Sequence, residues 1–506
     1  MSNQYDVIVV GAGNGGLVAA ANTAKEGLKT LLLEKHNLPG GCATSFKRGR
    51  FEFEPSLHEL CSVGKAENPD TVYKVFDSLG AKIDWRYESN VFRTIVKGKD
   101  GYDLTLKAGI EEFCKSIDDA APGSYKSVKK FLELFDKIDA AINYIFKMKG
   151  NPNPLVMITK HADFMRIAGH SVEEVMTALG MPEKAQNIIN TYWGYLGVPT
   201  DELNAMHFMN MVHSYVVDGA AMPHHRSHEL SLSLIDILTK YDGEVRYNSE
   251  VTKFLFNDEG ACIGVEANGE QFFAKEIISN VIPHNVYNMS DTKKIPQRLM
   301  KLANARDFGI SVATVYLGLD CTAEELGFKD YTIFIEGVAN PRKQYDNRKE
   351  DGLYIVNCLN NVVEDASPEG TSTLFFTIPV FGFDLPDDLT PQSYKKYKNE
   401  LAKKYIEDAE KVLGISITPH IEEISVATPV TFARYLGTPE GTIYGYKLSG
   451  WDNLMARTAS EKDDYCIPGL SFCGGHYIRG DGYSCAYLMG EMIGKRVAKK
   501  LKGGNA

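Results

Sequence analysis

Three features that would place a protein in other classes are missing from this sequence. The nine cysteines form an odd, scattered set without a C-x-x-C pair, which argues against a disulfide framework and against a zinc site. The formal net charge of −11 argues against nucleic acid as a partner, because its phosphates favour a basic protein face. No apolar run approaches the roughly 18–20 residues that span a bilayer. We therefore expect reduced thiols in a cytoplasmic protein.

The remaining composition is that of a soluble globular protein. Apolar residues make up 44% of the chain and charged residues 24%. An early apolar run at residues 7–10 is short, ends at Gly11 and has no basic region before it, so we expect no secretory signal. With 506 residues the chain is too long for one hydrophobic core, which predicts two or three domains.

Residues 5–34 carry the pattern of a strand, a turn, a helix and a second strand. Residues 5–10 and 29–34 are short, nearly continuous apolar runs, as is typical of parallel strands that are buried on both faces. Residues 17–26 are rich in alanine, and Gly27 follows at the position of a helix C-cap. This spacing predicts a right-handed βαβ unit.

The turn of that unit reads Gly11-x-Gly13-x-x-Gly16, and Glu34 ends the second strand. In dinucleotide-binding units the first glycine permits the tight turn, the second lets the backbone approach the pyrophosphate, and the third allows close helix–strand packing. Free N–H groups at the helix N-terminus then face the phosphates. A glutamate at the strand end accepts hydrogen bonds from a ribose hydroxyl and disfavours a 2′-phosphate. We therefore predict a bound dinucleotide other than NADP.

A second glycine turn, Pro39-Gly40-Gly41, follows Glu34 after a short loop. A glycine turn so close to the ribose acid is what FAD enzymes use to wrap the rest of the cofactor, so we predict FAD rather than NAD. Together with residues 11–34 and 51–54, this turn resembles the phytoene desaturase, carotenoid isomerase and retinol saturase family of flavoproteins, within the flavin amine-oxidase superfamily.

The resemblance extends along nearly the whole chain. Residues 244–251 resemble the strand whose valine backbone holds the adenine, which implies that role for Val251. Residues 468–475 and the following Gly482 resemble the C-terminal strand and helix at the flavin. The resemblance therefore implies that Gly474, Gly475 and Gly482 bind the cofactor, and that the last helix points its N-terminus at the flavin.

Two positions depart from the family. Glu54-Pro55-Ser56 stands where the family usually has Asp-x-Gly, and Gly475 stands where it usually has an acidic or amide residue. The second departure weakens the expected side-chain contact to the ribityl chain or phosphate, although backbone N–H groups can replace it. Neither departure argues against FAD binding.

Beyond the first unit the pattern is helical from about residue 112 to residue 217, and short strands follow, with a hairpin around Asn268-Gly269. The organisation is α/β, with a helical insertion and a second sheet. We expect a Rossmann-like FAD-binding domain assembled from discontinuous segments, a mixed-sheet substrate domain and a helical lid. The expected bounds are 1–62, 222–290 and 428–506 for the FAD-binding domain, 63–110 and 291–427 for the substrate domain, and 111–221 for the lid.

The segment at residues 223–229, Pro-His-His-Arg-Ser-His-Glu, is the most unusual in the chain. The resembling family carries a Gly-Gly-Met loop here, near flavin and substrate, which makes His224, His225 and Arg226 candidates for catalysis. A histidine can move a proton at neutral pH, and Arg226 can pair with an anionic substrate group. A solvated or structural loop is an open alternative, and so is a metal site on His224 and His228. We predict no resident metal, because a flavin needs none.

Two further histidines are catalytic candidates. His58 follows the second glycine turn, and the retinol saturase branch carries a histidine at the same place. A buried imidazole that is hydrogen-bonded to backbone is the alternative reading. His476 directly follows Gly474-Gly475 and is therefore expected near the flavin. Cys42 is expected to be a packed residue, because no second cysteine is nearby to form a redox pair.

The helical insertion is rich in aromatic residues and methionine, which suits a pocket for a long, irregular apolar ligand. We therefore predict an FAD-dependent oxidoreductase that acts on carbon–carbon double bonds of a hydrophobic lipid, namely a carotenoid, a retinoid or an unsaturated fatty acid. Saturation, desaturation and redox-neutral isomerisation all stay open, as does the electron donor or acceptor.

Two other functions stay open from the sequence. A flavin amine oxidase shares the cofactor architecture and would form hydrogen peroxide from an amine. A lipid-binding flavoprotein without turnover would keep its flavin oxidised whatever substrate is supplied. Basic residues on the helix at residues 126–147 and in the last helix leave peripheral membrane contact open, beside the default reading of a solvated face.

Overall fold

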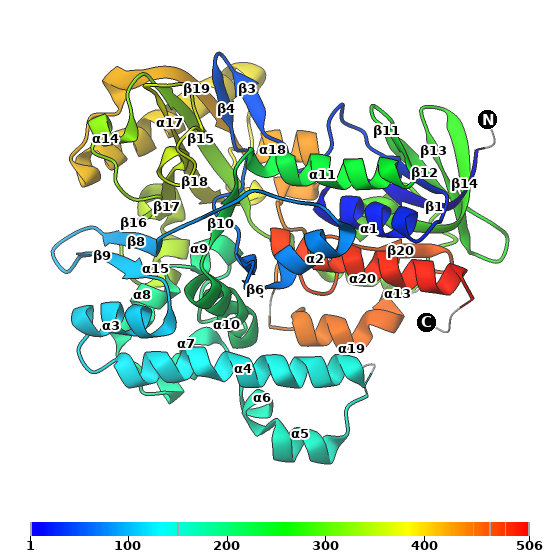
Figure 1. Ribbon diagram of the computed structural model, residues 1–506, viewed down its shortest axis with the longest axis horizontal. Coiled ribbons are helices and arrows are strands. Elements are labelled where there is room, and N and C mark those ends of the chain that lie inside the picture. Colours follow the sequence, from blue (N-terminus) through cyan, green and yellow to red (C-terminus); the bar gives the residue numbers. More distant parts are fainter. Residues whose placement is uncertain (1–2, 149–150, 449, 465–466, 481, 504–506) are drawn as a thin grey trace.

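The computed structural model describes residues 3–148, 151–448, 450–464, 467–480 and 482–503. The chain is built around two seven-stranded sheets that lie on opposite sides of the molecule (Figure 1). A group of helices from the middle of the chain covers the region below the second sheet in that view. The predicted α/β architecture with a helical insertion and a second sheet is confirmed.

The first sheet contains the predicted βαβ unit. β1 (Gln4–Val10) pairs in parallel with β2 (Thr30–Leu33), and α1 (Asn14–Lys25) connects them. All four residues of β2 are buried, as expected for a strand that is covered on both faces. The sheet order is β11-β2-β1-β14-β13-β12, and β20 pairs with β14. The other strands are β11 (Glu244–Arg246), β12 (Val251–Phe256), β13 (Cys262–Ala267), β14 (Glu270–Ser279) and β20 (Leu470–Phe472).

Strands that are far apart in sequence meet along β14. Its first half pairs antiparallel with β13 in the predicted hairpin, and its second half pairs in parallel with β20 near the end of the chain. On its other edge, β14 pairs in parallel with β1. The strand therefore joins the N-terminal unit to the C-terminal segment, which is why both reach the same place.

Helices cover the first sheet. α1 packs against α11 (Arg226–Lys240) and α20 (Tyr483–Leu501), and α2 (Thr71–Leu79) packs against α20. The last helix agrees with the prediction for the end of the chain. α11 begins at Arg226, and the side chain of Glu54 caps its first turn.

The second sheet is mixed, with the order β19-β15-β18-β17-β16-β8-β9. β15 (Ser311–Leu319) and β18 (Ser372–Val380) are buried along their whole length. α17 (Pro391–Leu413) packs on one face of the sheet, and the hairpin of β3 (Phe46–Arg48) and β4 (Phe51–Phe53) packs on the other. The remaining strands are β8 (Asn90–Val96), β9 (Tyr102–Lys107), β16 (Thr332–Glu336), β17 (Leu353–Cys358) and β19 (Ile421–Ala427).

The helical insertion forms a third cluster of buried side chains, which also contacts β16 and β17. Its longest element is α4 (Tyr125–Lys147), close to the helix expected at 124–145. The others are α3 (Ile110–Ala120), α5 (Pro154–Lys160), α6 (Ala162–Ile167), α7 (Val172–Ala178), α8 (Glu183–Asn190), α9 (Trp193–Leu196) and α10 (Ala205–His213). None of the helices in the described ranges combines the length and apolar character that a bilayer crossing requires.

The proposed domain division follows these layers. The strands of the first sheet fall within the segments proposed for cofactor binding, and those of the second sheet fall within the two segments proposed for substrate binding. The division itself stays a proposal. β8, β9 and β19, which lie toward the edges of the second sheet, were not predicted from the sequence.

α1 and α20 approach each other closely because α20 carries glycines at the contact. A Cβ at Gly490 would overlap the backbone oxygen of Gly15, and a Cβ at Gly494 would lie 2.9 Å from the backbone oxygen of Ala19. Gly490 and Gly494 are four residues apart and therefore share one face of the helix. These two glycines set the distance between the two helices.

We expect Gly490→Ala to destabilise the protein. Overpacking of this kind costs about 1–3 kcal/mol, and the better helix propensity of alanine offsets about 1 kcal/mol of it. The measurement is the melting temperature by circular dichroism. Gly169→Ala is the matched control, because a Cβ at Gly169 meets nothing within 4 Å. Equal melting temperatures for the two variants would contradict the close approach of α1 and α20.

Candidate functional site

The first glycine turn has no room for side chains. Gly11 has a φ of +92°, which favours glycine, and a Cβ at Gly16 would overlap the backbone oxygen of Gly11. A Cβ at Gly13 would lie 2.6 Å from Nδ2 of Asn280, and one at Gly15 would lie 2.7 Å from the backbone nitrogen of Gly474. Backbone therefore forms the surface of this turn.

Glu34 is held in place by two backbone N–H groups. Its Oε2 accepts a hydrogen bond from the N–H of Ala12 at 2.7 Å, and its Oε1 accepts one from the N–H of His36 at 2.8 Å. The residue is buried and lines a cavity beside the glycine turn. Each carboxylate oxygen keeps further acceptor capacity, so the fixed side chain can bind hydroxyl groups in the cavity.

The second glycine turn lies directly on the first. The N–H of Gly40 donates to the backbone oxygen of Ala12 at 2.7 Å, and a Cβ at Gly41 would lie 3.3 Å from the Cα of Gly13. Gly13 and Gly40 also form an isolated parallel bridge. The two turns therefore make one continuous backbone surface.

The C-terminal segment completes this surface. β20 places Gly474 beside Asn280, where a Cβ at Gly474 would overlap the Asn280 side chain. α20 begins at Tyr483, directly after Gly482, so its first N–H groups point toward the cavity that Gly475 and Gly482 line. A Cβ at Gly475 would lie 3.2 Å from the backbone oxygen of Tyr444, so the acidic or amide side chain of the family would be tightly placed here.

The cavity has a volume of about 480 Å³ and joins the glycine turns to the helical insertion. At one end its lining includes Glu34 and Val251, and at the other it includes Tyr195, Met211 and Tyr215 from the helices. The predicted cofactor residues that line it are Gly11, Gly13, Glu34, Gly40, Gly41, Val251, Gly475 and Gly482. Gly16 and Gly474 do not line the cavity and instead allow the close packing behind it.

Among the catalytic candidates, His58 and His476 line the cavity. The His58 ring stacks on Tyr195 with centroids 5.5 Å apart, and its Nε2 is buried without a hydrogen-bond partner in the described chain. Burial lowers the pKa of His58 to about 3. Burial, followed by the charge of Arg457, lowers the pKa of His476 to about 3 as well. Both imidazoles are therefore neutral at physiological pH and lack the acidic proton of an imidazolium.

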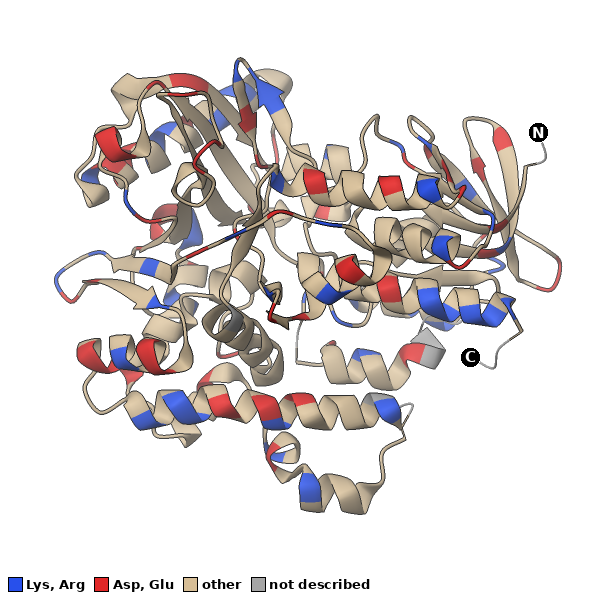
Figure 2. Ribbon diagram, viewed as in Figure 1, with Lys and Arg blue, Asp and Glu red and all other residues tan. Residues whose placement is uncertain are grey.

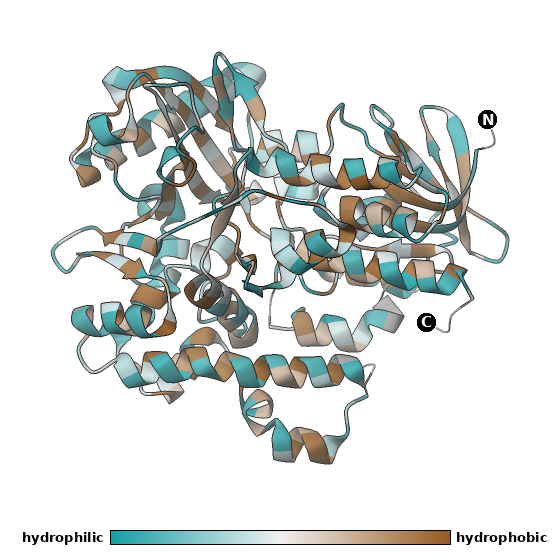
Figure 3. Ribbon diagram, in the orientation of Figure 1, coloured by the Kyte–Doolittle hydropathy of each residue, from teal (hydrophilic) through white to brown (hydrophobic). Residues whose placement is uncertain are grey.

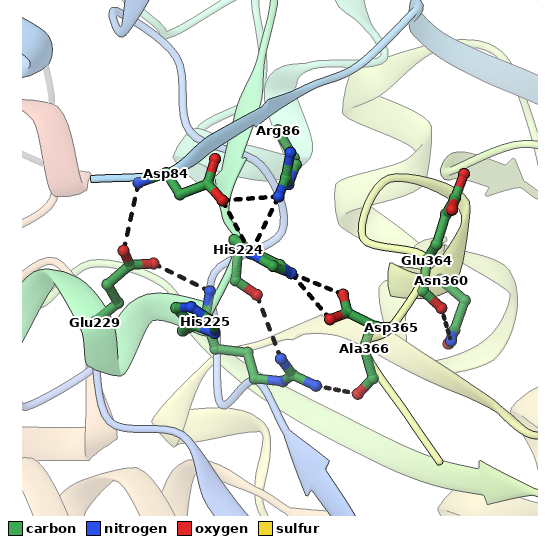
Figure 4. A network of polar contacts seen from close by, with 10 residues as sticks. Asp84, Arg86, His224, His225, Glu229, Asn360, Glu364, Asp365 and Ala366 are labelled. Atoms are coloured by element: carbon green, nitrogen blue, oxygen red, sulfur yellow. Dashed lines mark hydrogen bonds and ion pairs between the residues drawn. The ribbon is translucent and has the colours of Figure 1, made fainter. Parts of the chain in front are cut away.

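His224 belongs to a polar network outside the cavity lining (Figure 4). Its Nδ1 lies 3.0 Å from Oδ2 of Asp84 and its Nε2 lies 2.8 Å from Oδ1 of Asp365. The exposed His225 stacks on His224 with ring centroids 4.4 Å apart. These contacts join the start of α11 to the loop that carries Asp365.

Arg226 also turns away from the cavity. Its guanidinium donates to the backbone oxygen of Ala366 and, at 3.4 Å, to that of His224 (Figure 4). The substrate-facing roles of His224, His225 and Arg226 stay predictions, and their position outside the cavity lining gives them no geometric support. The backbone of Arg226 is left-handed, with a φ of 65°, where α11 begins.

The alternative hypothesis of a metal site on His224 and His228 gains no support either. In the described ranges, the group of side chains that gathers three metal-binding atoms within 4.8 Å is Asp320, Cys321 and His420, beside the second sheet. Neither His224 nor His228 belongs to it.

The departure at Glu54 has a structural explanation. Its carboxylate accepts hydrogen bonds from the backbone N–H and the hydroxyl of Ser227 and so caps α11. Burial raises the pKa of Glu54 to about 7, and the Ser227 hydrogen bonds oppose that rise.

Burial also raises the pKa of Cys42 to about 11, so this cavity-lining residue is a neutral thiol rather than a reactive thiolate.

Several cavity residues were missed from the sequence. Glu59 lines the cavity next to His58, and Tyr195 and Tyr215 reach it from the helical insertion. The sequence does contain a signal for Glu59, because this acid directly follows His58, a catalytic candidate. The two tyrosines carry no local signal, because their positions depend on how the helices pack against the second sheet.

Comparison with known proteins fits this geometry. A family model for the NAD(P)-binding Rossmann-like domain matches residues 9–79. All-trans-retinol 13,14-reductase from Danio rerio is 25% identical over 476 residues, which cover 87% of this chain and 77% of that protein. Chloroplastic prolycopene isomerase from Daucus carota is 22% identical over 520 residues, which cover 99% of this chain and 81% of that protein.

The fold matches solved oxidoreductase structures. A double mutant of putrescine oxidase superimposes with a TM-score of 0.64 at 16% identity, covering 98% of this chain and 99% of that one. At this identity the match speaks for the fold alone. The chain is therefore a homologue of all-trans-retinol 13,14-reductases and prolycopene isomerases, contains a Rossmann-like dinucleotide-binding domain, and shares its overall fold with putrescine oxidase.

Proposed function

We propose that this protein is an FAD-dependent oxidoreductase that acts on carbon–carbon double bonds of a hydrophobic lipid, such as a carotenoid, a retinoid or an unsaturated fatty acid. One observation carries the proposal. A single cavity is lined both by the two glycine turns and by aromatic and methionine side chains of the helical insertion. A dinucleotide bound on the glycine turns would therefore share one cavity with an apolar substrate.

The residues at the glycine turns fit FAD. Glu34 would accept hydrogen bonds from the ribose, and the side-chain-free surface at Gly11, Gly13 and Gly40 would lie against the pyrophosphate. The N-terminus of α20 would place positive partial charge near the flavin end. When bound, FAD supplies reversible hydride exchange with carbon.

The other end of the cavity suits a lipid. Leu57, Leu196 and Met211 give it an apolar surface, and Tyr195 and Tyr215 add aromatic rings. Methionine adapts its shape to irregular apolar ligands, and aromatic rings stack on conjugated chains. These side chains would orient a polyene and exclude water from the reacting bond.

The two groups of relatives support chemistry at a double bond. One carries the name of a reductase of retinol and the other that of an isomerase of prolycopene. Both changes are available to a lipid held beside a flavin, so the direction is not fixed by the fold. Because the fold also matches putrescine oxidase, amine oxidation is the alternative activity. Its observation in place of lipid conversion would contradict the proposal.

Exposed apolar residues support the further proposal of peripheral membrane contact. Leu155 and Ile158 on α5 and Met165 on α6 have exposed fractions of 68%, 64% and 54%. α5 and α6 protrude at one end of α4 (Figure 3). α4 itself carries charges of both signs along its length, so it offers no purely basic face (Figure 2). A lipid substrate would enter most easily from a membrane that this tip touches.

We expect Glu34→Ala to weaken FAD binding by about 10- to 100-fold, since hydrogen bonds to a charged group contribute about 1.5–3 kcal/mol. The measurement is a titration of FAD-free protein with FAD, followed by flavin fluorescence. Glu112→Ala, an exposed acid on α3, is the control with unchanged affinity. Equal affinity in both variants would rule out Glu34 as the ribose ligand.

We expect the FAD-loaded protein, reduced without oxygen, to convert an offered lipid. All-trans-retinol would gain two hydrogen atoms on saturation, and a poly-cis carotenoid would change retention time at constant mass on isomerisation. Chromatography with mass spectrometry distinguishes the products. Oxidation of a primary amine under air with release of hydrogen peroxide, without any lipid conversion, would replace the proposal by amine oxidation.

We expect the double variant Leu155→Ser, Ile158→Ser to lose affinity for anionic phospholipid vesicles in a sedimentation assay, because the tip loses apolar area. Leu232→Ser with Val430→Ser removes exposed apolar side chains at other sites and is the control. Equal sedimentation of the wild type and both variants would exclude α5 as a membrane contact.

A further inference from the structure

Glu59 is a buried acid of the cavity wall, and its pKa is linked to that of the half-buried Glu88. Each of the two carboxyl groups shifts the pKa of the other. Glu59 is 4% exposed and lines the cavity, while Glu88 lies in the chain between β7 (Trp85–Tyr87) and β8. Neighbouring carboxylates repel each other, which favours a proton on at least one of the two.

Hydroxyl groups surround the pair. Tyr195 donates to Oε1 of Glu59 at 2.8 Å, and Thr332 donates to Oε2 at 3.3 Å. The other titratable groups that face the pair from neighbouring elements are Tyr192, Tyr215, Tyr331 and Cys61. All of these are neutral at physiological pH. In the described chain, no lysine or arginine is among the groups that shift the pKa of either acid.

The surroundings therefore favour the protonated state. Burial raises the pKa of Glu59 to about 7, and its hydrogen bonds to Glu88, Tyr195 and Thr332 oppose that rise. Burial and the neighbouring Glu59 raise the pKa of Glu88 well above its usual range. Near neutral pH, Glu59 therefore exchanges a proton.

The histidines that line the same cavity cannot donate a proton near neutral pH. The pKa values of His58 and His476 are lowered to about 3 by burial, so neither carries an acidic proton at neutral pH. The thiols of Cys42 and Cys61 hold theirs too tightly, because burial raises the pKa of each to about 11. Glu59 is the cavity-lining acid whose proton moves near neutrality.

We propose that Glu59 is the catalytic acid and base at the double bond, that Glu88 shares its proton, and that Tyr195 is a positioning residue. The assignment rests on the proposed function. His58 lies next to Glu59 in the chain, its ring stacks on Tyr195, and all three residues line the cavity.

In the saturating direction the substrate gains a hydride from the reduced flavin of the proposed function and a proton from Glu59. The O–H bond of Glu59 breaks, a C–H bond forms on the carbon next to the one that takes the hydride, and the O–H electron pair stays on Glu59. The carboxylate accepts a hydrogen bond from Tyr195, and water restores its proton. In the desaturating direction the Glu59 carboxylate accepts the proton instead.

We expect Glu59→Gln to reduce saturating turnover by about 10²- to 10⁴-fold, the usual contribution of a general acid, without a change in FAD affinity. In the wild type, saturating turnover should fall as the pH rises through about 7, because Glu59 loses its proton. Tyr195→Phe removes a hydrogen bond that lowers the pKa of Glu59, so this fall should move to higher pH. A purely structural role for Tyr195 would leave the pH profile in place.

Infrared difference spectra test the pair without turnover. FAD-free and FAD-loaded protein should each show a carboxyl C=O band that titrates near pH 7 and is lost in Glu59→Gln. Glu336→Gln is the matched control: burial raises the pKa of Glu336 to about 7 too, but this residue is held by Thr94 and Thr191 outside the cavity lining. That variant should keep the Glu59 band, the turnover and the pH profile.

The outcomes separate the two proposals. Wild-type turnover in Glu59→Gln, or the absence of a titrating band that depends on Glu59, overturns the acid–base assignment while the proposed function stands. A wild type that converts neither the retinoid nor the carotenoid overturns the proposed function, and with it the catalytic role of the pair. A Glu59-dependent band with the expected pH shift in Tyr195→Phe supports the assignment.

Discussion

Contact between backbone and backbone around the first glycine turn is the constraint on which the rest of the structure depends. Gly13, Gly15 and Gly16 leave no space for a Cβ, because Asn280, Gly474 and Gly11 already occupy it. Gly490 repeats this arrangement on α20. Three parts of the chain that lie far apart in sequence, namely residues 11–16, Asn280 and residues 474–490, therefore meet within van der Waals distance, and a methyl group at any of these glycines would separate them.

This close assembly explains why the cavity lies where it does. β14 fixes β1 on one edge and β20 on the other, so the N-terminal turn and the start of α20 end at the same edge of the sheet. The second sheet and the helical insertion are attached beyond that edge. The space between them is closed by side chains of the helices, which gives one end of the cavity a polar backbone surface and the other an apolar one.

Burial also decides which groups in the cavity carry protons. It favours the neutral form of every ionisable group, so it removes the proton from imidazoles and retains it on carboxyls. His58 and His476 are therefore neutral, whereas burial raises the pKa of Glu59 at the cavity wall to about 7. By residue type alone, histidine is the favoured group for proton transfer near neutral pH. In the low-dielectric interior of this protein, a buried glutamate is favoured instead.

The sequence by itself determined the βαβ unit, the Asn268-Gly269 hairpin, the helical insertion and the position of Glu34 at a strand end. These features depend on local periodicity and on glycine geometry, which a chain expresses within a few residues. Tertiary structure decided that Arg226 turns toward Ala366, and that Glu88 meets Glu59 across 29 positions of chain. Those contacts depend on long-range packing and burial, and no local pattern encodes which distant groups share a low-dielectric space.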